Sequence, residues 1–281
     1  MGETIEDIIL RHSGRGMLRL RPYVQPDYCR AAARAMLSLK RGTVLLLTGF
    51  YVHHKAETDG PAGTFAVAQA LRRLGFTPVI VTDTYCLHIF EPYGFETVYF
   101  PFDGTEKEAD ALLERYRPVC LFSLERCGRN RDGRYTNMRG EDIGAYTAPL
   151  DWLFLRAEGK LPTFAVGDGG NEIGMGTLSE AIEEKLSLTP CAVRADYILI
   201  ATVSNWGGYG FCAAMEQLTG EPVTPTFAQI HTFMVHASVA ADCIDGVTRF
   251  YTLTEDGFSA GITEEILGAL LEASGRKELR A

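Results

Sequence analysis

The sequence lacks the segments that mark membrane, secreted and common nucleotide-binding proteins. Its apolar runs fall far short of the ~20 residues that a membrane-spanning helix requires. The opening residues, Met-Gly-Glu-Thr-Ile-Glu-Asp, have no basic region followed by an apolar stretch, so no signal peptide is indicated. The phosphate-binding pattern Gly-x-x-x-x-Gly-Lys-Ser/Thr is absent, and Gly49 is not followed by the later glycines of a Gly-x-Gly-x-x-Gly turn. We therefore expect a cytoplasmic protein with no nucleotide cofactor and no membrane partner.

Positive charge is scarce as well. There are 27 Lys and Arg against 36 Asp and Glu, which gives a net charge of −9 and argues against binding to nucleic acid. The seven cysteines are scattered without a Cys-x-x-Cys pair, so neither a zinc site nor a disulfide framework is predicted. Cys120 and Cys191 lie in or beside apolar runs and are interpreted as small buried hydrophobic residues. No repeat or linker divides the chain, and residues 1–281 are predicted to form one domain.

What the sequence contains is a regular alternation of apolar strands and amphipathic helices. Continuous apolar runs predict strands that are buried on both faces, at 43–47, 77–81, 119–122, 163–166 and 195–201, with a further short run at 97–100. Apolar residues at helical spacing predict helices at 4–11, 28–39, 61–74, 106–116, 145–158, 178–186, 211–218, 227–241 and 264–273. The basic segment 11–21 is interpreted as a solvated connection. This order predicts an α/β fold of Rossmann-like, three-layer type, a mostly parallel sheet with helices on both faces.

One stretch, residues 167–176, combines five glycines with one Asp, one Asn and one Glu in the order Gly-Asp-Gly-Gly-Asn-Glu-Ile-Gly-Met-Gly. It lies between a predicted strand and a predicted helix, at the edge of an α/β sheet where ligands bind. Glycine allows a ligand to approach the backbone closely, and Asp168, Asn171 and Glu172 would present functional groups to it. The plain alternative is a glycine-rich connection in which Asp168 only forms a turn.

Small or polar residues follow each of the predicted strands. The carboxyl ends of parallel strands lie on one edge of a sheet, so these residues are expected to converge on one crevice. Several carboxylates in one crevice either bind a hard cation or act as acid and base with separated pKa values. Oxygen ligands without His or Cys favour Mg²⁺ or Mn²⁺. Each carboxylate also has a plain alternative role as a helix cap or ion-pair partner.

Two loops are longer or more charged than a connection requires. Residues 48–63 form a long polar loop between a strand and a helix, and loops of that length are usually functional. Its adjacent histidines, His53 and His54, cannot easily point the same way, so a metal role for them is disfavoured. Residues 127–140 are rich in Arg, Asn and Gly, which leaves two interpretations open: a solvated surface loop, or a loop that binds an anion through arginine.

Several of these blocks together resemble the D-glutamate cyclase C-terminal-like family, over nearly the whole chain. The blocks are Thr48-Gly-Phe, Glu-Thr-Asp-Gly-Pro-Ala-Gly at 57–63, Glu125-Arg126, the glycine-rich stretch 167–176, Ser-Asn-Trp-Gly-Gly at 204–208 and Asp-Gly-Val at 245–247. The resemblance implies conversion of D-glutamate to 5-oxo-D-proline with loss of water, helped by a divalent cation such as Mn²⁺ or Mg²⁺. It implies a small amino acid as the substrate, and it leaves open whether identical chains associate.

The residues expected to carry that chemistry fall into three groups. The catalytic candidates are Asp168, Glu172, Asn171 and Glu125. The substrate-binding candidates are Thr48, Gly49, Arg126, Gly169, Gly170, Ser204, Asn205 and Trp206, with Arg126 expected to hold the α-carboxylate. The metal-ligand candidates are Glu57, Asp59 and Asp83. Two other functions stay open, a metal-dependent lyase or hydrolase acting on another small amino or hydroxy acid, and a catalytically silent module that binds a small carboxylate.

Overall fold

A six-stranded, wholly parallel sheet forms the centre of the computed structural model, which describes residues 2–276. The strands lie in the order β5 (Glu96–Tyr99), β4 (Thr77–Thr82), β1 (Thr43–Thr48), β6 (Cys120–Leu124), β7 (Thr163–Gly167) and β8 (Tyr197–Ile200). The five predicted strands are confirmed, and the short apolar run at 97–100 supplies the edge strand β5. The ends of the predicted domain, residue 1 and residues 277–281, lie outside the described residues.

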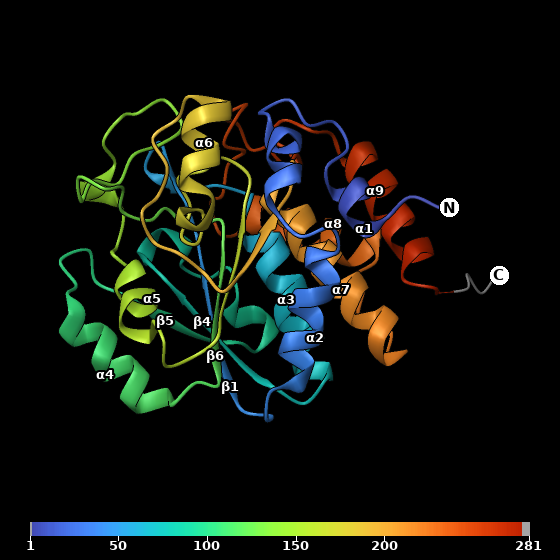
Figure 1. The fold of residues 1–281 in the computed structure, drawn as a ribbon, viewed down its shortest axis with the longest axis horizontal. Helices are drawn as coiled ribbons and strands as arrows, with labels where there is room; N and C mark the ends of the chain where they lie inside the picture. Colours follow the sequence, from blue (N-terminus) through green and yellow to red (C-terminus); the bar gives the residue numbers. More distant parts are fainter. Residues whose placement is uncertain (1, 277–281) are drawn as a thin grey trace.

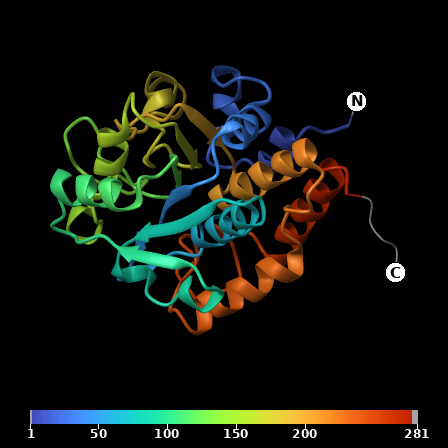
Figure 2. The same cartoon turned by 90° about the horizontal axis from the view of Figure 1, so that it is seen from below.

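Helices cover both faces of this sheet and confirm the predicted three-layer fold. One face carries α2 (Tyr28–Ser38), α3 (Pro61–Arg73) and α7 (Ser204–Thr219), and the other carries α4 (Glu106–Tyr116) and α5 (Asp151–Ala157) (Figure 1). Figure 2 shows α8 (Phe227–Val239) and α9 (Ala260–Ala273), in orange and red, outside the first helical layer. The other short elements are α1 (Ile5–Ile9), α6 (Ser179–Leu186), β2 (Tyr51–Val52), β3 (Lys55–Ala56), and the 3₁₀ turns η1 (Met17–Tyr23), η2 (Thr84–Cys86), η3 (Glu91–Tyr93), η4 (Gly144–Tyr146) and η5 (Gly176–Leu178).

Two glycines allow the helices α3 and α7 to approach each other at backbone contact. A Cβ atom on Gly208 would lie 3.1 Å from the Cα of Gly63 and 2.8 Å from the Cδ1 of Leu124. Any side chain at either glycine would therefore push the two helices apart. The close crossing brings the first turn of α7 against the loop that precedes α3, and this is where the polar residues of both segments meet.

Two predictions about the chain between strands are wrong in part. The helix predicted at 145–158 begins only at Asp151, after the turn η4, because Pro149 would lack a backbone hydrogen bond and would clash inside such a helix. The segment 11–21 is a solvated connection only in part, since Arg19 is exposed but other residues of the segment are not. It contains the start of η1, whose Met17 and Leu20 are buried, and it places Arg15 inside the molecule.

The strand order reverses between the neighbouring strands β1 and β6. After β1 the chain moves outward through β4 to β5, and after β6 it moves the opposite way through β7 to β8. In open α/β sheets the crevice outside the carboxyl ends of two such strands is the usual ligand site. Among residues 2–276, no helix is both long enough and apolar enough to cross a membrane.

Candidate active site

A cavity of about 520 Å³ opens at this reversal of the strand order. Its deeper lining includes the buried residues Glu57, Glu125 and Asn171 and the partly buried Arg15, each of which comes from a different segment of the chain. The rest of the lining comes from the two loops singled out in the sequence, 48–63 and 127–140, from residues 141–146, and from residues 246–249. The predicted convergence of strand ends on one crevice is therefore confirmed for the segments after β1, β6 and β7, whereas Arg15 and residues 246–249 were not predicted there.

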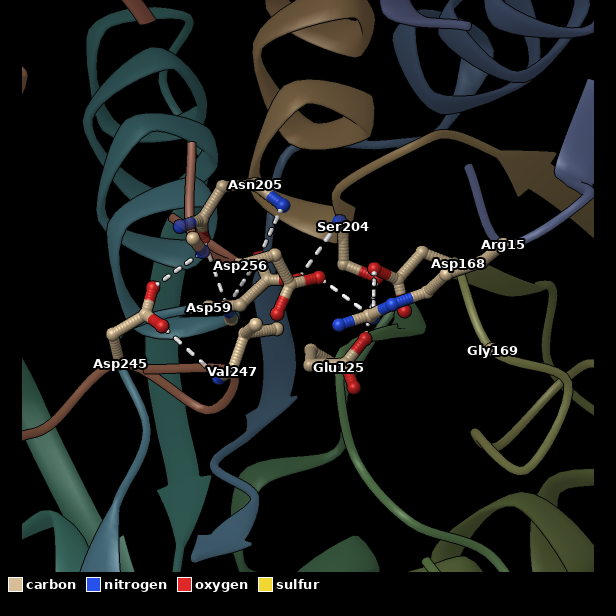
Figure 3. A network of polar contacts seen from close by, with 12 residues as sticks. Arg15, Asp59, Glu125, Asp168, Gly169, Ser204, Asn205, Asp245, Val247 and Asp256 are labelled. Carbon is tan, nitrogen blue, oxygen red and sulfur yellow. Dashed lines mark hydrogen bonds and ion pairs between the residues drawn. The ribbon is translucent and has the colours of Figure 1, made fainter. Parts of the chain in front are cut away.

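Five acidic side chains form the floor of the cavity or lie next to it, and we call them the carboxylate cluster. Glu57 and Glu125 line the cavity, and Asp59, Asp168 and Asp256 are buried beside them. Figure 3 shows Asp59, Glu125, Asp168 and Asp256. Carboxylate oxygens of Asp59, Asp168 and Asp256 lie within 4.8 Å of one another, and so do oxygens of Glu125, Asp168 and Glu172. Asp168 belongs to both groups. It comes from the glycine-rich stretch, which therefore forms one wall of the site.

Arg15 reaches into the middle of the carboxylate cluster (Figure 3). Its Nη1 lies 2.9 Å from Oδ2 of Asp168 and 2.7 Å from Oδ2 of Asp256. No acceptor within residues 2–276 engages its Nε or Nη2, and 28% of its side chain is exposed. Arg15 therefore holds two acids together while it keeps donors available to a ligand in the cavity.

The first turn of α7 fixes the position of Asp59. The backbone amides of Ser204 and Asn205 donate to the Asp59 carboxylate at 3.0 and 2.7 Å, where the positive end of the helix dipole also lies. The Ser204 hydroxyl donates to Glu125 at 2.6 Å. The Asn205 side chain accepts hydrogen bonds from the amides of Gly60 and Gly63. Ser204 and Asn205 thus hold two members of the carboxylate cluster in place.

The glycine-rich stretch is organised by Glu172. Its Oε1 accepts from the amide of Gly169 at 2.6 Å and its Oε2 accepts from the amide of Gly170 at 2.7 Å. Gly170 has a φ of 98°, a conformation that side chains strongly disfavour. Glu172 is therefore committed to the turn that presents Asp168, whose Oδ1 is buried and has no partner within the described residues.

Burial and mutual repulsion raise the pKa of every acid in the carboxylate cluster. The pKa of Glu57, Asp59, Glu125 and Asp256 lies well above its ordinary value, first because burial disfavours the charged form and then because neighbouring acids repel it. Burial also raises the pKa of Asp168 to about 8, although Arg15 opposes the shift. For Arg15 itself burial acts against the charge, but Asp168 and Asp256 outweigh it and raise its pKa.

Two of the expected site residues bind each other instead of joining the cluster. Arg126 Nη1 lies 2.6 Å from Oδ2 of Asp83, and its other hydrogen bonds go to the carbonyl oxygens of Gly49 and Ala148. Asp83 also accepts from the amide of Tyr85. Both side chains are almost fully buried. The pair thus connects the loops that follow β1, β4 and β6, behind the residues that line the cavity.

The remaining expected residues support the site from within the protein. Trp206 is fully buried and donates from Nε1 to Glu255 at 3.1 Å. The Asn171 side chain donates to the carbonyl of Thr136 at 2.8 Å and lines the cavity. Gly169 lines a smaller neighbouring cavity of about 190 Å³. The hydroxyl of Thr48 is buried without a partner in the described part of the chain.

Two residues of the site were not anticipated from the sequence. Arg15 lies in a Ser-Gly-Arg-Gly segment, and the flanking glycines were the available signal of an unusual chain path, since Gly16 has a φ of 94°. Asp256 lies in a Glu-Asp-Gly segment after α8, in a region without strand or helix periodicity, where an Asp-Gly pair indicates only a turn. Neither follows a strand of the sheet.

The donor set fits a hard divalent cation. Asp59, Asp168 and Asp256 offer only oxygen atoms, which suits Mg²⁺ or Mn²⁺ better than zinc. A single arginine faces the five acids, so the floor holds more negative than positive charge whenever most of the acids are ionised. The unpartnered Oδ1 of Asp168 is a further available ligand atom. Glu57 lies beside these acids, whereas Asp83 does not belong to either group of close oxygens.

Fold and site together define a Rossmann-like α/β domain with a buried acidic pocket at the reversal of its strand order. The family described as "D-glutamate cyclase-like, C-terminal" matches residues 5–271, so the chain belongs to that family. A curated relative is the Homo sapiens protein named "D-glutamate cyclase, mitochondrial", which is 35% identical over 210 residues. The alignment covers 65% of this chain and 34% of the human protein, so the chain spans about a third of that relative's length. The cytoplasmic location stays a prediction.

Proposed function

We propose that this chain catalyses the ring closure of D-glutamate to 5-oxo-D-proline with loss of water. The proposal rests on the carboxylate cluster and Arg15, which meet at the cavity from five separate segments in a member of the D-glutamate cyclase-like family. The name of the human relative supports the same substrate. Such a reaction makes the enzyme a lyase that removes water.

Arg15 would bind the α-carboxylate of the substrate. Its guanidinium faces the cavity with Nε and Nη2 available, and arginine suits a planar carboxylate because its donors form a rigid fork. Arg126 is less suited to this role than the sequence indicated, because its donors are committed to Asp83 and to backbone carbonyls. Arg15 therefore replaces Arg126 in the proposal as the residue that orients the substrate.

The proton transfers are assigned to the two glutamates that line the cavity. The ammonium group of the substrate must lose a proton before its nitrogen attacks the side-chain carboxyl group, and the departing oxygen must gain protons. Burial and the neighbouring acids raise the pKa of both Glu57 and Glu125, which favours carboxyl groups that can exchange protons with a substrate. We assign Glu125 as the base, held by Ser204, and Glu57 as the acid.

Asp59, Asp168 and Asp256 would hold a divalent cation, Mn²⁺ or Mg²⁺, which when bound supplies a Lewis acid for the side-chain carboxylate of the substrate. The rest of the rate enhancement would come from holding the substrate in a bent conformation. Glutamate must bend so that its nitrogen meets its own side-chain carbon, and holding that geometry contributes up to ~7–11 kcal/mol in favourable reactions. The buried floor, with Arg15 fixed by two acids, is suited to that task.

The test is to incubate the purified protein with D-glutamate and either Mn²⁺, Mg²⁺ or EDTA, and to measure 5-oxo-D-proline by chiral chromatography. We expect product from the wild type and none from Asp168→Asn, whose circular dichroism should match that of the wild type. The exposed Asp103→Asn is the matched control and should retain activity.

Two results would overturn this proposal. Thermal stabilisation by D-glutamate without product in any metal would identify a module that binds small carboxylates. Turnover of another amino or hydroxy acid in a substrate panel, with none of D-glutamate, would identify a different lyase or hydrolase.

A further inference from the structure

The cavity extends well beyond the groups that bind one small amino acid. Its volume of about 520 Å³ falls within the range of roughly 300–1,000 Å³ that encloses drug-sized ligands. The buried lining residues form its floor. The opposite end, which we call the mouth, is exposed and lined by Tyr51, His54, Tyr146, Arg139 and Arg249. Free D-glutamate bound at the floor would leave the mouth without a ligand group.

The first feature of the mouth is a cluster of three aromatic rings. The rings of Tyr51 and Tyr146 stack with centroids 4.5 Å apart and an angle of 7° between their planes. His54 meets the edge of Tyr146 at 5.4 Å, and its Nδ1 lies 3.3 Å from the Tyr51 hydroxyl. These rings come from two loops that lie far apart in the sequence. The loop after β1 and the turn η4 are therefore brought together to build one apolar surface.

The second feature is two arginines that lack an acidic partner. Arg139 and Arg249 are exposed, and neither forms an ion pair with any residue that the structure describes. Acids also occur at the mouth, but Glu141 accepts from the Asn137 side chain at 2.6 Å and Asp142 accepts from the amide of Gly144 at 2.8 Å. Glu141 and Asp142 keep their charge, but neither is paired with an arginine in the described part of the chain, so Arg139 and Arg249 keep guanidinium donors available to an anionic group of a ligand.

We propose that the site also accepts γ-D-glutamyl amides whose amine half carries a carboxylate, the class formed by γ-D-glutamyl amino acids and peptides. The proposal rests on the proposed function, because the head of such a compound has the free α-amine and α-carboxylate of D-glutamate and would bind at the floor in the same way. The amine half would lie along Tyr51 and Tyr146. Its carboxylate would meet Arg139 and Arg249.

The reaction is the same ring closure with a different leaving group. The α-nitrogen forms a bond to the γ-carbon, and the bond between the γ-carbon and the amide nitrogen breaks. The proton lost by the ring nitrogen ends on the departing nitrogen, so the products are 5-oxo-D-proline and a free amino acid or peptide. No oxidant, reductant or further reactant is needed. An amine replaces water as the product that leaves through the mouth.

The experiment compares three substrates with the full chain: D-glutamate, γ-D-glutamyl-glycine and γ-D-glutamyl-methylamide. 5-Oxo-D-proline and the released amine are measured together. We expect equal amounts of 5-oxo-D-proline and glycine from the glycine conjugate, and a kcat/KM about tenfold lower for the methylamide, which lacks the carboxylate. Exposed ion pairs are weak, so each arginine should account for about two- to fivefold.

The double variant Arg139→Gln, Arg249→Gln should remove most of the preference for the glycine conjugate over the methylamide. Arg134→Gln is the matched control, because Arg134 lies on the same loop, pairs with Asp132 and does not line the cavity. It should leave the preference unchanged.

The outcomes separate the two proposals. Turnover of D-glutamate with no product from the glycine conjugate would overturn this inference and leave the proposed function standing. Turnover of the conjugate alone would support the inference and overturn D-glutamate as the substrate. No product from any of the three would overturn both.

Discussion

Asn205 connects the two halves of the site, and its loss should be costly. It is fully buried in the first turn of α7. Its side-chain oxygen accepts from the amides of Gly60 and Gly63 at 2.9 and 2.6 Å. Its side-chain nitrogen donates to the carbonyl of Thr58 at 3.1 Å and to Glu255 at 2.8 Å. These four bonds join α7 to the loop before α3 and to the segment that carries Asp256.

The cost of Asn205→Ala follows from what happens to each partner. Two partners keep another hydrogen bond, the amide of Gly60 to Asp59 and the carboxylate of Glu255 to Tyr209. The amide of Gly63 and the carbonyl of Thr58 are left buried without a partner. An unsatisfied buried polar group costs about 1–3 kcal/mol, so the free energy of unfolding should fall by about 4 kcal/mol.

Urea unfolding followed by circular dichroism measures this loss. The control is Gln217→Ala, an exposed amide on the same helix with a single hydrogen bond to the carbonyl of Ala273, which should cost about 0.5–1 kcal/mol. If Asn205→Ala costs no more than this control, the bonds of Asn205 do not hold the site together and the reasoning is wrong. A variant that fails to fold at all would agree with it, provided that Gln217→Ala folds.

Three further predictions address packing, pH and metal. Gly208→Ala should destabilise the protein by about 1–3 kcal/mol because it forces α7 away from Gly63, whereas Gly268→Ala, at an exposed helical position with open space, should stabilise it by up to about 1 kcal/mol. Burial disfavours the charged form of Glu216, but hydrogen bonds from Arg276 and from the backbone amide of Thr224 outweigh burial and lower the pKa of Glu216. The stability difference between wild type and Glu216→Gln should therefore be full above about pH 4.5 and disappear as the pH falls below it in urea titrations. The acids of the carboxylate cluster have raised pKa values in the folded protein, so their ionisation at higher pH disfavours the folded state. The melting temperature measured by fluorimetry in EDTA should therefore fall as the pH rises toward 9. Binding of Mn²⁺ to the ionised acids should reverse that fall.

The sheet could be predicted because its signal is local. An apolar run such as residues 43–47 indicates a strand buried on both faces wherever it occurs, and the alternation with helices then determines the fold class. The rule that parallel strands end on one edge brought Glu125 and Asp168 to the same place before any coordinates were known. The error at 145–158 came from giving apolar spacing more weight than Pro149, which a helix interior does not tolerate.

The partners of each charged residue could not be predicted, because sequence spacing does not encode them. Asp83 and Arg126 both follow strands and were expected in the crevice, yet they neutralise each other behind its wall. Arg15 and Asp256 follow no strand, yet they meet at its centre. Arg15 lies on the connection between α1 and α2, and Asp256 lies on the connection between α8 and α9. The paths of these two connections bring both residues to the edge of the sheet, and such paths depend on tertiary packing. Strand ends placed Glu125 and Asp168 at one crevice, and only the folded chain shows which charged groups lie beside the cavity.

The chemistry of the site also explains what the protein does not use. Within the described residues the seven cysteines are free and buried, and burial raises the pKa of each thiol, so they are poor nucleophiles. The hydroxyl of Ser204 is engaged by Glu125. A ring closure needs no nucleophile from the protein, since the attacking nitrogen belongs to the substrate. In the proposed reaction the protein has only to bend the substrate, hold its charge and move protons, and carboxylates around Arg15 are suited to all three. The leaving group would then be the one part of the substrate that the floor does not fix, and under the inference above the residues of the mouth would select it.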